Sequence, residues 1–159
     1  MKRVTCPHCG MQLTMTEIDD LPRGGTRPAA LRRLLNKPDA KVKALGDNRF
    51  ECEGEEYMIL TDLEADSKCY DAVTDSLWSF RPSFILDHVS GVDNTVELQN
   101  ALADMQDRLC DNSNALIKVM IDDLYDFVND AVAADGRGHF LAFYDCIEHQ
   151  EGEYFIYRV

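Results

Sequence analysis

The chain has 159 residues and a formal net charge of −13, from 29 Asp and Glu against 16 Lys and Arg. Hydrophobic residues make up 45% of it, which is typical of a globular protein and excludes a wholly disordered chain. No apolar run approaches the roughly 20 residues that span a bilayer, and polar residues interrupt the N-terminus where a signal peptide would have its apolar core. We therefore expect a soluble, cytoplasmic protein that has no membrane partner.

Up to residue 60, turn residues alternate with short apolar runs. Pro and Gly are concentrated in residues 18–30, where they favour a loop. The apolar runs between such residues are too short for long helices, and Glu53–Glu55 has the composition of a hairpin turn. The predicted elements are short strands within residues 1–17, a loop at 18–30, a helix at 29–36, and a β-hairpin with strands at 49–52 and 57–60.

From Thr61 onward the apolar spacing becomes helical. The predicted helices cover residues 63–79, Pro82 to Gly91, about 94–109, and 112 or 113 to 136, of which the last is the longest. Two β-rich runs follow, at His139–Tyr144 and Tyr154–Val159, and we expect them to pair as a terminal hairpin that lies on the helices. The predicted fold class is α+β, with a small zinc-knuckle and β module at residues 1–60. The second predicted domain, residues 61–159, is a helical body closed by the C-terminal hairpin.

The charge is divided unevenly between these two parts. Residues 1–50 carry 10 Lys and Arg against 5 Asp and Glu, a net charge of +5, whereas residues 51–159 carry 6 against 24, a net charge of −18. A strongly anionic surface repels nucleic acid and anionic lipid, which argues against generic binding of either by residues 51–159. The acidity is either a solvated surface or a surface that engages a basic groove on a partner.

The most specific motif is Cys6-Pro7-His8-Cys9-Gly10, which resembles the knuckle of a zinc ribbon. Two thiolates three positions apart can share a metal, and Gly10 permits the left-handed turn that points backbone N–H groups at sulfur. A complete ribbon needs four ligands, and Cys52-Glu53-Gly54-Glu55 has the outline of a second knuckle with a carboxylate in place of the fourth thiolate. The predicted cofactor is one zinc ion per chain, held by Cys6, Cys9, Cys52 and Glu55. His8 or Cys69 could complete the site instead, and a reduced, metal-free turn is the competing interpretation.

Four further residues are candidates for binding. Arg32 and Arg33 lie in the basic segment, where they could contact the phosphates of nucleic acid or pair with the acidic part of the chain itself. The scarcity of aromatic residues among residues 1–50 disfavours base stacking there. Arg137 stands between two glycines and is followed by His139, so this turn would present both side chains to an anion or a carboxylate. A tight structural turn with a pair between Asp135 and Arg137 is the alternative.

Catalytic signatures are weak. The polar set His139, Asp145, Glu148 and His149 has the residue types for acid–base work or metal binding, but its spacing matches no metal-binding helix motif. The sequence contains neither a nucleophile elbow nor a glycine-rich phosphate loop. A small hydrolase that uses His139 or His149 is therefore the least favoured of the functional interpretations.

Several stretches of residues 61–159 resemble small uncharacterised proteins encoded by bacteriophages and related mobile elements. The stretches are Ser76-Leu77-Trp78-Ser79-Phe80 with Phe84-Ile85-Leu86, then Asp135 to Leu141 with Tyr144-Asp145, then Tyr154 to Arg158. The turn after Asp145 departs from the Asp-Gly-Glu-Glu pattern of those proteins. The resemblance implies a setting inside a bacterium and brings no catalytic residues with it.

Together these features favour a non-enzymatic binding protein in the cytoplasm of a bacterial host. Its acidic surface would engage a host protein and interfere with a defence enzyme or a nucleic-acid enzyme. The alternative is a nucleic-acid-binding accessory protein that acts through the basic residues 1–50.

Overall fold

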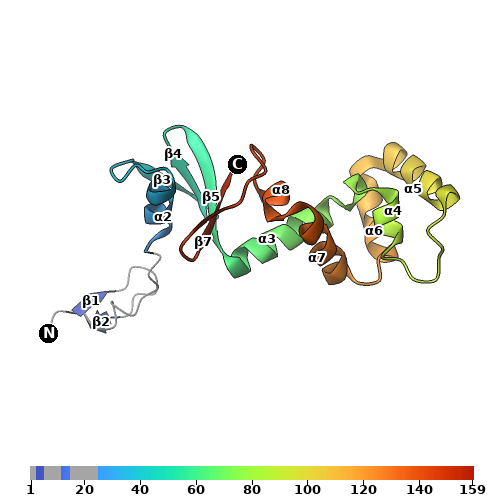
Figure 1. The fold of residues 1–159 in the computed structure, drawn as a ribbon, viewed down its shortest axis with the longest axis horizontal. Helices are drawn as coiled ribbons and strands as arrows, with labels where there is room; N and C mark the ends of the chain where they lie inside the picture. The colour runs from blue at the N-terminus through green and yellow to red at the C-terminus, as the bar shows by residue number, and fades with distance from the viewer. Residues whose placement is uncertain (1–2, 6–11, 15–24) are drawn as a thin grey trace. The chain divides into compact units, whose positions relative to one another are not determined.

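The computed structural model describes residues 3–5, 12–14 and 25–159 (Figure 1). The strands β1 (Arg3–Thr5) and β2 (Gln12–Thr14) form an antiparallel pair, as expected for short strands on either side of the cysteine motif. Cys6, His8 and Cys9 lie outside the described residues. The chain forms two compact units: Met1–Asp62 with His149–Ile156, and Leu63–Glu148 with Tyr157–Val159. We call them the sheet unit and the helical unit.

The sheet unit is built on a five-stranded sheet with the order β3-β4-β5-β7-β6 (Figure 1). Three of its strands follow one another in the chain and two come from the C-terminal end. The strands are β3 (Val42–Gly46), β4 (Arg49–Cys52), β5 (Glu55–Thr61), β6 (His149–Glu151) and β7 (Tyr154–Arg158). The hairpin predicted at 49–60 is confirmed, with β4 and β5 as its strands and Cys52 opposite Glu55 in the register.

The β3–β4 and β4–β5 hairpins are each closed by a tight turn with left-handed backbone. Asp47 and Asn48 have φ of 48° and 61°, and Glu53 and Gly54 have φ of 54° and 84°. Two successive positive φ values match the twist that antiparallel strands need in a two-residue turn. Asn, Asp and Gly tolerate this conformation best, which accounts for three of these four turn residues.

One helix, α2 (Arg27–Leu34), packs against the sheet. It begins two residues before the predicted start at Ala29, because Pro28 suits the first helical turn. Ala30 and Leu31 are fully buried against Cys52, Tyr57, Ile59 and Ile156, and these six residues form the core of the unit. Arg27 ties the helix to the sheet, since its Nε donates to the Ile59 carbonyl over 3.0 Å.

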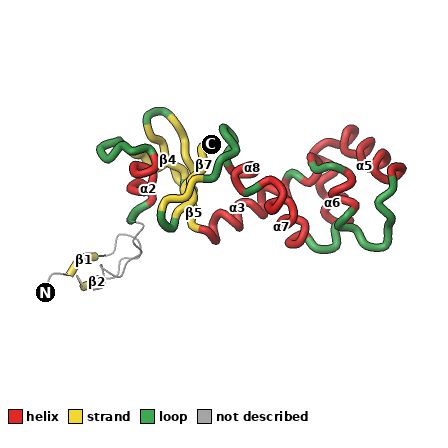
Figure 2. The backbone as a smooth tube through the Cα atoms, in the orientation of Figure 1, coloured by secondary structure: helices red, strands yellow, loops and turns green. Residues whose placement is uncertain are grey.

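The helical unit contains helices joined by short turns, except for the longer loop at residues 87–95 (Figure 2). A 3₁₀ turn, η1, continues the chain directly after α3, and a second, η2, follows α5. The elements are α3 (Asp62–Asp75), η1 (Leu77–Ser79), α4 (Pro82–Leu86), α5 (Val96–Leu109), η2 (Cys110–Ser113), α6 (Asn114–Met120), α7 (Leu124–Asp135) and α8 (Arg137–Leu141). Helices form at all three predicted places, but the one predicted over 63–79 ends at Asp75 and is followed by η1, and the one predicted from Pro82 to Gly91 ends at Leu86. The helix predicted at about 94–109 is confirmed, with Thr95 as its N-cap.

The side-chain amides of Gln106 and Asn114 form hydrogen bonds that stabilise the turn after α3. The buried Gln106 of α5 donates from Nε2 to the carbonyls of Trp78 and Phe80, over 2.7 and 2.8 Å. Asn114, the first residue of α6, accepts from the Trp78 amide over 2.8 Å and donates to the Thr74 carbonyl over 3.2 Å. These bonds satisfy backbone groups that the end of a helix leaves without intrahelical partners.

The prediction of one long helix from residue 112 to 136 is wrong. The helix is broken at Ile121, whose backbone is extended with ψ of 127°, and a new helix begins after Asp123. The Asp123 side chain accepts from the amides of Tyr125 and Asp126, which makes it the N-cap of α7. A capping carboxylate inside an apolar helical pattern thus starts a second helix, although the apolar pattern continues through the break.

The prediction of a strand at His139–Tyr144 is also wrong, because the helix α8 runs through Leu141 and a turn follows it. Gly138, Leu141 and Ala142 are its buried residues, and their spacing of three and four is helical. The hairpin partner of β7 is β6, to which it is joined through Gly152. The C-terminal hairpin therefore extends the sheet, with β7 beside β5, and does not close the helical body.

Among the helices that the structure describes, none is both long enough and apolar enough to cross a bilayer.

Candidate functional site

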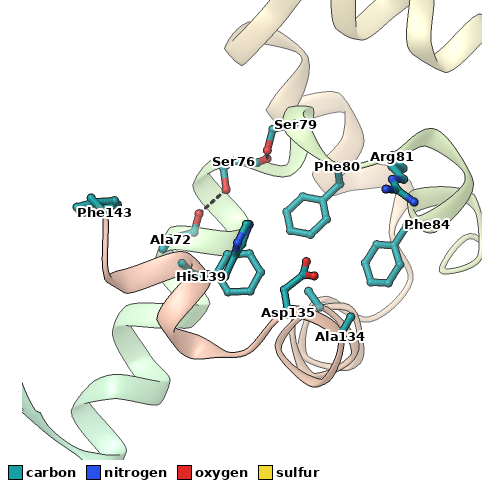
Figure 3. Close-up of a pocket in the computed structure, with 12 residues that line it drawn as sticks. Ala72, Ser76, Ser79, Phe80, Arg81, Phe84, Ala134, Asp135, His139 and Phe143 are labelled. Carbon is teal, nitrogen blue, oxygen red and sulfur yellow. Dashed lines mark hydrogen bonds between the residues drawn. The ribbon is translucent and has the colours of Figure 1, made fainter. Parts of the chain in front are cut away.

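The helical unit contains a pocket of about 680 Å³ (Figure 3). It is bounded by α3 and η1 on one side, by the start of α4 on another, and by α7 and α8. Its lining residues are Ala72, Ser76, Ser79, Phe80, Arg81, Phe84, Ala131, Ala134, Asp135, His139, Phe140 and Phe143.

Four phenylalanines give the pocket its apolar wall. The rings of Phe80 and Phe84 stack with centroids 5.7 Å apart, and Phe80 also stacks on Phe140 at 6.2 Å. The fully buried ring of Phe127 supports this wall edge-on, 5.1 Å from Phe80 and 4.9 Å from Phe84. Phe143, at the outer rim, has 74% of its surface exposed. Such contacts between aromatic rings hold the wall in a defined geometry.

Small side chains leave the space between the helices open. Ala72 projects from α3, and Ala131 and Ala134 project from α7. Ser76 donates from its hydroxyl to the Ala72 carbonyl over 2.6 Å, as Figure 3 shows, and Ser79 donates to the Ser76 carbonyl over 2.7 Å. Because both hydroxyl protons are used within the unit, these serines offer a ligand only acceptor lone pairs.

Three ionisable side chains complete the lining: Arg81 before α4, Asp135 at the end of α7, and His139 in α8. All three are exposed, and none has an ion-pair partner among the residues that the structure describes. In Figure 3 the Asp135 carboxylate points into the space between Phe80 and the helix α7, while Arg81 lies at the edge near Phe84. The pocket therefore combines an aromatic wall with one inward carboxylate.

Arg137, which was predicted to contact an anion, is bound by carboxylates of its own unit. Its Nε and Nη2 donate to the two carboxylate oxygens of Glu148 over 2.9 and 3.2 Å, and its Nη1 donates to Asp66 over 2.8 Å. Only 13% of the side chain is exposed. The partner is thus not Asp135, which the turn interpretation had paired with Arg137. An external anion would have to displace two carboxylates to reach this guanidinium.

The same network reaches Tyr157 and Cys69. Tyr157 is fully buried and donates to Glu148 over 2.5 Å. Burial, followed by this bond to Glu148, raises the pKa of the Tyr157 hydroxyl well above its usual value. Burial likewise raises the pKa of the Cys69 thiol to about 11, so this thiol stays protonated at neutral pH and is a poor nucleophile and a poor metal ligand.

Gly138 explains how this network is held against α8. A Cβ at this position would lie 2.6 Å from the Cys146 carbonyl oxygen and 2.8 Å from the Glu148 amide nitrogen. Both atoms belong to the backbone, so the segment that carries Glu148 can approach α8 this closely only where a side chain is absent. The glycine at this position thus serves packing, and His139, the next residue, lines the pocket.

In the described half of the predicted zinc site, Cys52 and Glu55 lie opposite each other in the β4–β5 register but differ in burial. Cys52 is 1% exposed and packs in the core of the sheet unit, whereas Glu55 is exposed. Among the residues that the structure describes, no group of three or more His, Cys, Asp or Glu side chains is arranged to hold a metal ion. Cys52 therefore has the placement of a small core residue, and its use as a ligand would require its withdrawal from the core.

The two candidate arginines of the basic segment make contacts within the sheet unit. Arg32 donates from Nε to the Ala40 carbonyl over 2.9 Å, and Arg33 forms an ion pair with Glu151 at 2.9 Å. Lys37 pairs with Glu53 in the same unit. Arg33 and Lys37 thus pair with the chain's own carboxylates, whereas Arg32 bonds to a backbone carbonyl.

Sequence reasoning missed the pocket as a whole. It considered Asp135 only as the partner of Arg137 in a structural turn. One feature of the sequence could have indicated the pocket. Asp135 is a carboxylate in the last turn of a helix, and that turn contains no basic residue. Such a carboxylate faces the negative end of the helix dipole, an unfavourable position that a bound cation would relieve.

Comparisons of this chain with protein-family models, curated proteins and solved structures found no match.

Proposed function

We propose that this protein is a non-enzymatic binding protein whose acidic helical unit engages a basic surface on another protein. In the phage setting that the sequence resemblance implies, the partner is a protein of the bacterial host, and a defence enzyme or a nucleic-acid enzyme is the most concrete version. Enzymes that act on nucleic acid, defence enzymes among them, present basic grooves. An anionic surface is complementary to such a groove.

The observation that carries this proposal is the charge of the helical unit. Leu63–Glu148 with Tyr157–Val159 contains 17 Asp and Glu against 6 Lys and Arg, a net charge of −11. Two of the six cations are engaged inside the unit: Arg137 in its carboxylate network, and Arg158 with its guanidinium 3.7 Å from the centre of the Tyr144 ring. The field of this unit is therefore negative and attracts cationic surfaces over roughly a Debye length.

The strongest candidates for contact lie on and just after α5. Asp104, Asp107 and Asp111 are exposed, and their carboxylates have no hydrogen-bond or ion-pair partner among the residues that the structure describes. Carboxylates without internal partners lose only water when a basic partner binds, so they are free to steer and select that partner.

The test is affinity capture from a nuclease-treated bacterial lysate at low salt. One bait is the full chain, and a second carries Asp104→Asn, Asp107→Asn and Asp111→Asn. A matched control bait carries three neutral substitutions at exposed carboxylates of the sheet unit: Asp39→Asn, Asp47→Asn and Glu56→Gln. We expect the wild type and the control to retain the same basic protein, and the α5 variant to bind it about tenfold more weakly.

Equal capture by all three baits would contradict the proposal, as would the absence of any enriched protein. Binding of labelled duplex DNA that weakens steeply with salt would instead favour the nucleic-acid accessory role of residues 1–50. Turnover of a substrate that is lost on replacement of His139 and His149 would point to an enzyme.

A further inference from the structure

We infer that the pocket of the helical unit binds an organic cation, namely the side chain of an arginine or lysine presented by the basic partner. The inference rests on the proposed function and names the chemistry by which one residue of that partner is held. The cation would enter between the aromatic wall and α7, with its charge at Asp135 and its aliphatic stem against the phenylalanine rings.

The aromatic wall suits a cation with an apolar stem. The face of an aromatic ring carries partial negative charge and attracts ammonium and guanidinium groups. Phe80, Phe84 and Phe140 supply ring surface along one side of the pocket, and their mutual stacking keeps that surface in place. Ala72 and Ala134, on the facing helices, leave the width that an extended methylene chain needs.

Asp135 supplies the charge. It is the last residue of α7, where the carbonyl groups of the final turn add partial negative charge beside its carboxylate. The last turn contains no basic residue, and no described residue forms an ion pair with Asp135. A cation at this point would satisfy the carboxylate and the helix end together.

Arg81 makes the inference testable in both directions. Its guanidinium lies at the rim near Phe84, where it repels a bound cation and would attract an anion (Figure 3). An anionic ligand would face Asp135, the end of α7 and a unit with a net charge of −11, so we expect Arg81 to lower cation affinity without reversing the preference of the pocket.

The experiment is an NMR titration of the full-length protein with N-acetyl-arginine amide, for which we expect weak, saturable binding with shifts of pocket residues in α7 and α8. The matched neutral probe is N-acetyl-citrulline amide, which has the shape of arginine without its charge, and the anionic probe is N-acetyl-glutamate amide. We expect Asp135→Asn to weaken arginine binding about fivefold and Arg81→Gln to strengthen it about twofold. Ala134→Leu, at an exposed position of α7, should block the pocket without disturbing the fold.

Several outcomes would overturn the inference. They are equal binding of citrulline and arginine probes, no effect of Asp135→Asn, tighter binding of the glutamate probe, and weaker rather than stronger arginine binding in Arg81→Gln. The lysate capture separates this result from the proposed function. If capture still depends on the α5 carboxylates while the pocket ignores arginine, only the pocket inference fails; if the pocket binds arginine but capture is insensitive to charge, only the proposed function fails.

Discussion

At the residue scale, the guanidinium of Arg137 makes three hydrogen bonds to two carboxylates while only 13% of its side chain is exposed. Loss of the guanidinium leaves the Glu148 carboxylate, 28% exposed, without its opposite charge, whereas Asp66 is 62% exposed and regains water. We therefore expect Arg137→Met to lower the free energy of unfolding of the helical unit by about 2–4 kcal/mol. Urea unfolding followed by the fluorescence of Trp78, the single tryptophan of the chain, reports this unit.

Arg108→Met is the matched control for Arg137→Met. Arg108 lies exposed on α5 and forms no ion pair with any residue that the structure describes, so its loss should change stability by less than about 0.5 kcal/mol. Equal effects of the two substitutions would mean that the carboxylate network of Arg137 contributes nothing specific to the fold.

The buried Cys69 thiol predicts how stability changes in alkaline solution. Burial raises the pKa of this thiol to about 11 from its ordinary value of 9.0, and burial also raises the pKa of Tyr157. Between pH 9 and pH 11 the Cys69 thiol loses its proton in the unfolded state and keeps it in the folded state, so the unfolded state binds fewer protons. The stability gained from the neutral thiol is complete below pH 9 and should fall as pH rises toward 11. Urea unfolding of wild type and Cys69→Ala across this range tests it: the variant should show a shallower decline, and parallel curves would contradict the assignment.

Cys52 can be either a metal ligand or a core residue. The sequence placed it in a zinc site with Cys6 and Cys9, whereas the structure places it in the core beside Ala30 and Leu31. We expect about one zinc per chain by elemental analysis, lost in the double variant Cys6→Ala with Cys9→Ala. Cys52→Ala should keep the metal and destabilise the sheet unit by about 1–2 kcal/mol. Loss of the metal in that variant, with the fold intact, would restore Cys52 as a ligand.

At the scale of elements, Asp123 decides where the long apolar pattern of residues 112–136 divides. Its carboxylate accepts from the amides of Tyr125 and Asp126, over 2.8 and 3.2 Å. Loss of a capping carboxylate costs about 1 kcal/mol, up to about 2 where the helix is packed, so Asp123→Ala should destabilise the helical unit by this amount. Asp126→Ala, at the exposed neighbouring carboxylate, should have a smaller effect in the same urea experiment. Equal stability of wild type and Asp123→Ala would show that the break is fixed by Ile121 packing alone.

Local patterns predicted the elements whose signals are local. The turn at Glu53-Gly54, the proline at the start of α4 and the helical spacing of α3 each depend on residues close in sequence, and each was predicted. His139–Tyr144 has the composition of a strand but forms the end of a helix and a turn. Gly138, just before it, packs against the backbone of Cys146 and Glu148, a contact between segments that the composition of residues 139–144 alone does not contain.

At the scale of the whole molecule, the predicted division after residue 60 lies close to the end of the N-terminal part of the sheet unit at Asp62. The sequence did not predict that β6 and β7 belong to the same unit, because strand partners across about 90 residues are set by three-dimensional packing. The pocket is a comparable case: its wall and its carboxylate come from α4, α7 and α8, whose meeting no local pattern encodes.

Charge is the property of the whole chain that sequence predicts best, and it sets a final expectation for stability. A net charge of −11 on the helical unit repels itself in the folded state, and salt screens that repulsion. We expect the free energy of unfolding reported by Trp78 to rise by about 0.5–1 kcal/mol between low and physiological salt. The variant with Asp104→Asn, Asp107→Asn and Asp111→Asn should be more stable than wild type at low salt and should depend less on salt. A decline with added NaCl would mean that internal ion pairs such as those of Arg137 outweigh the repulsion among surface carboxylates, and that the acidity is balanced within the fold rather than available to a partner.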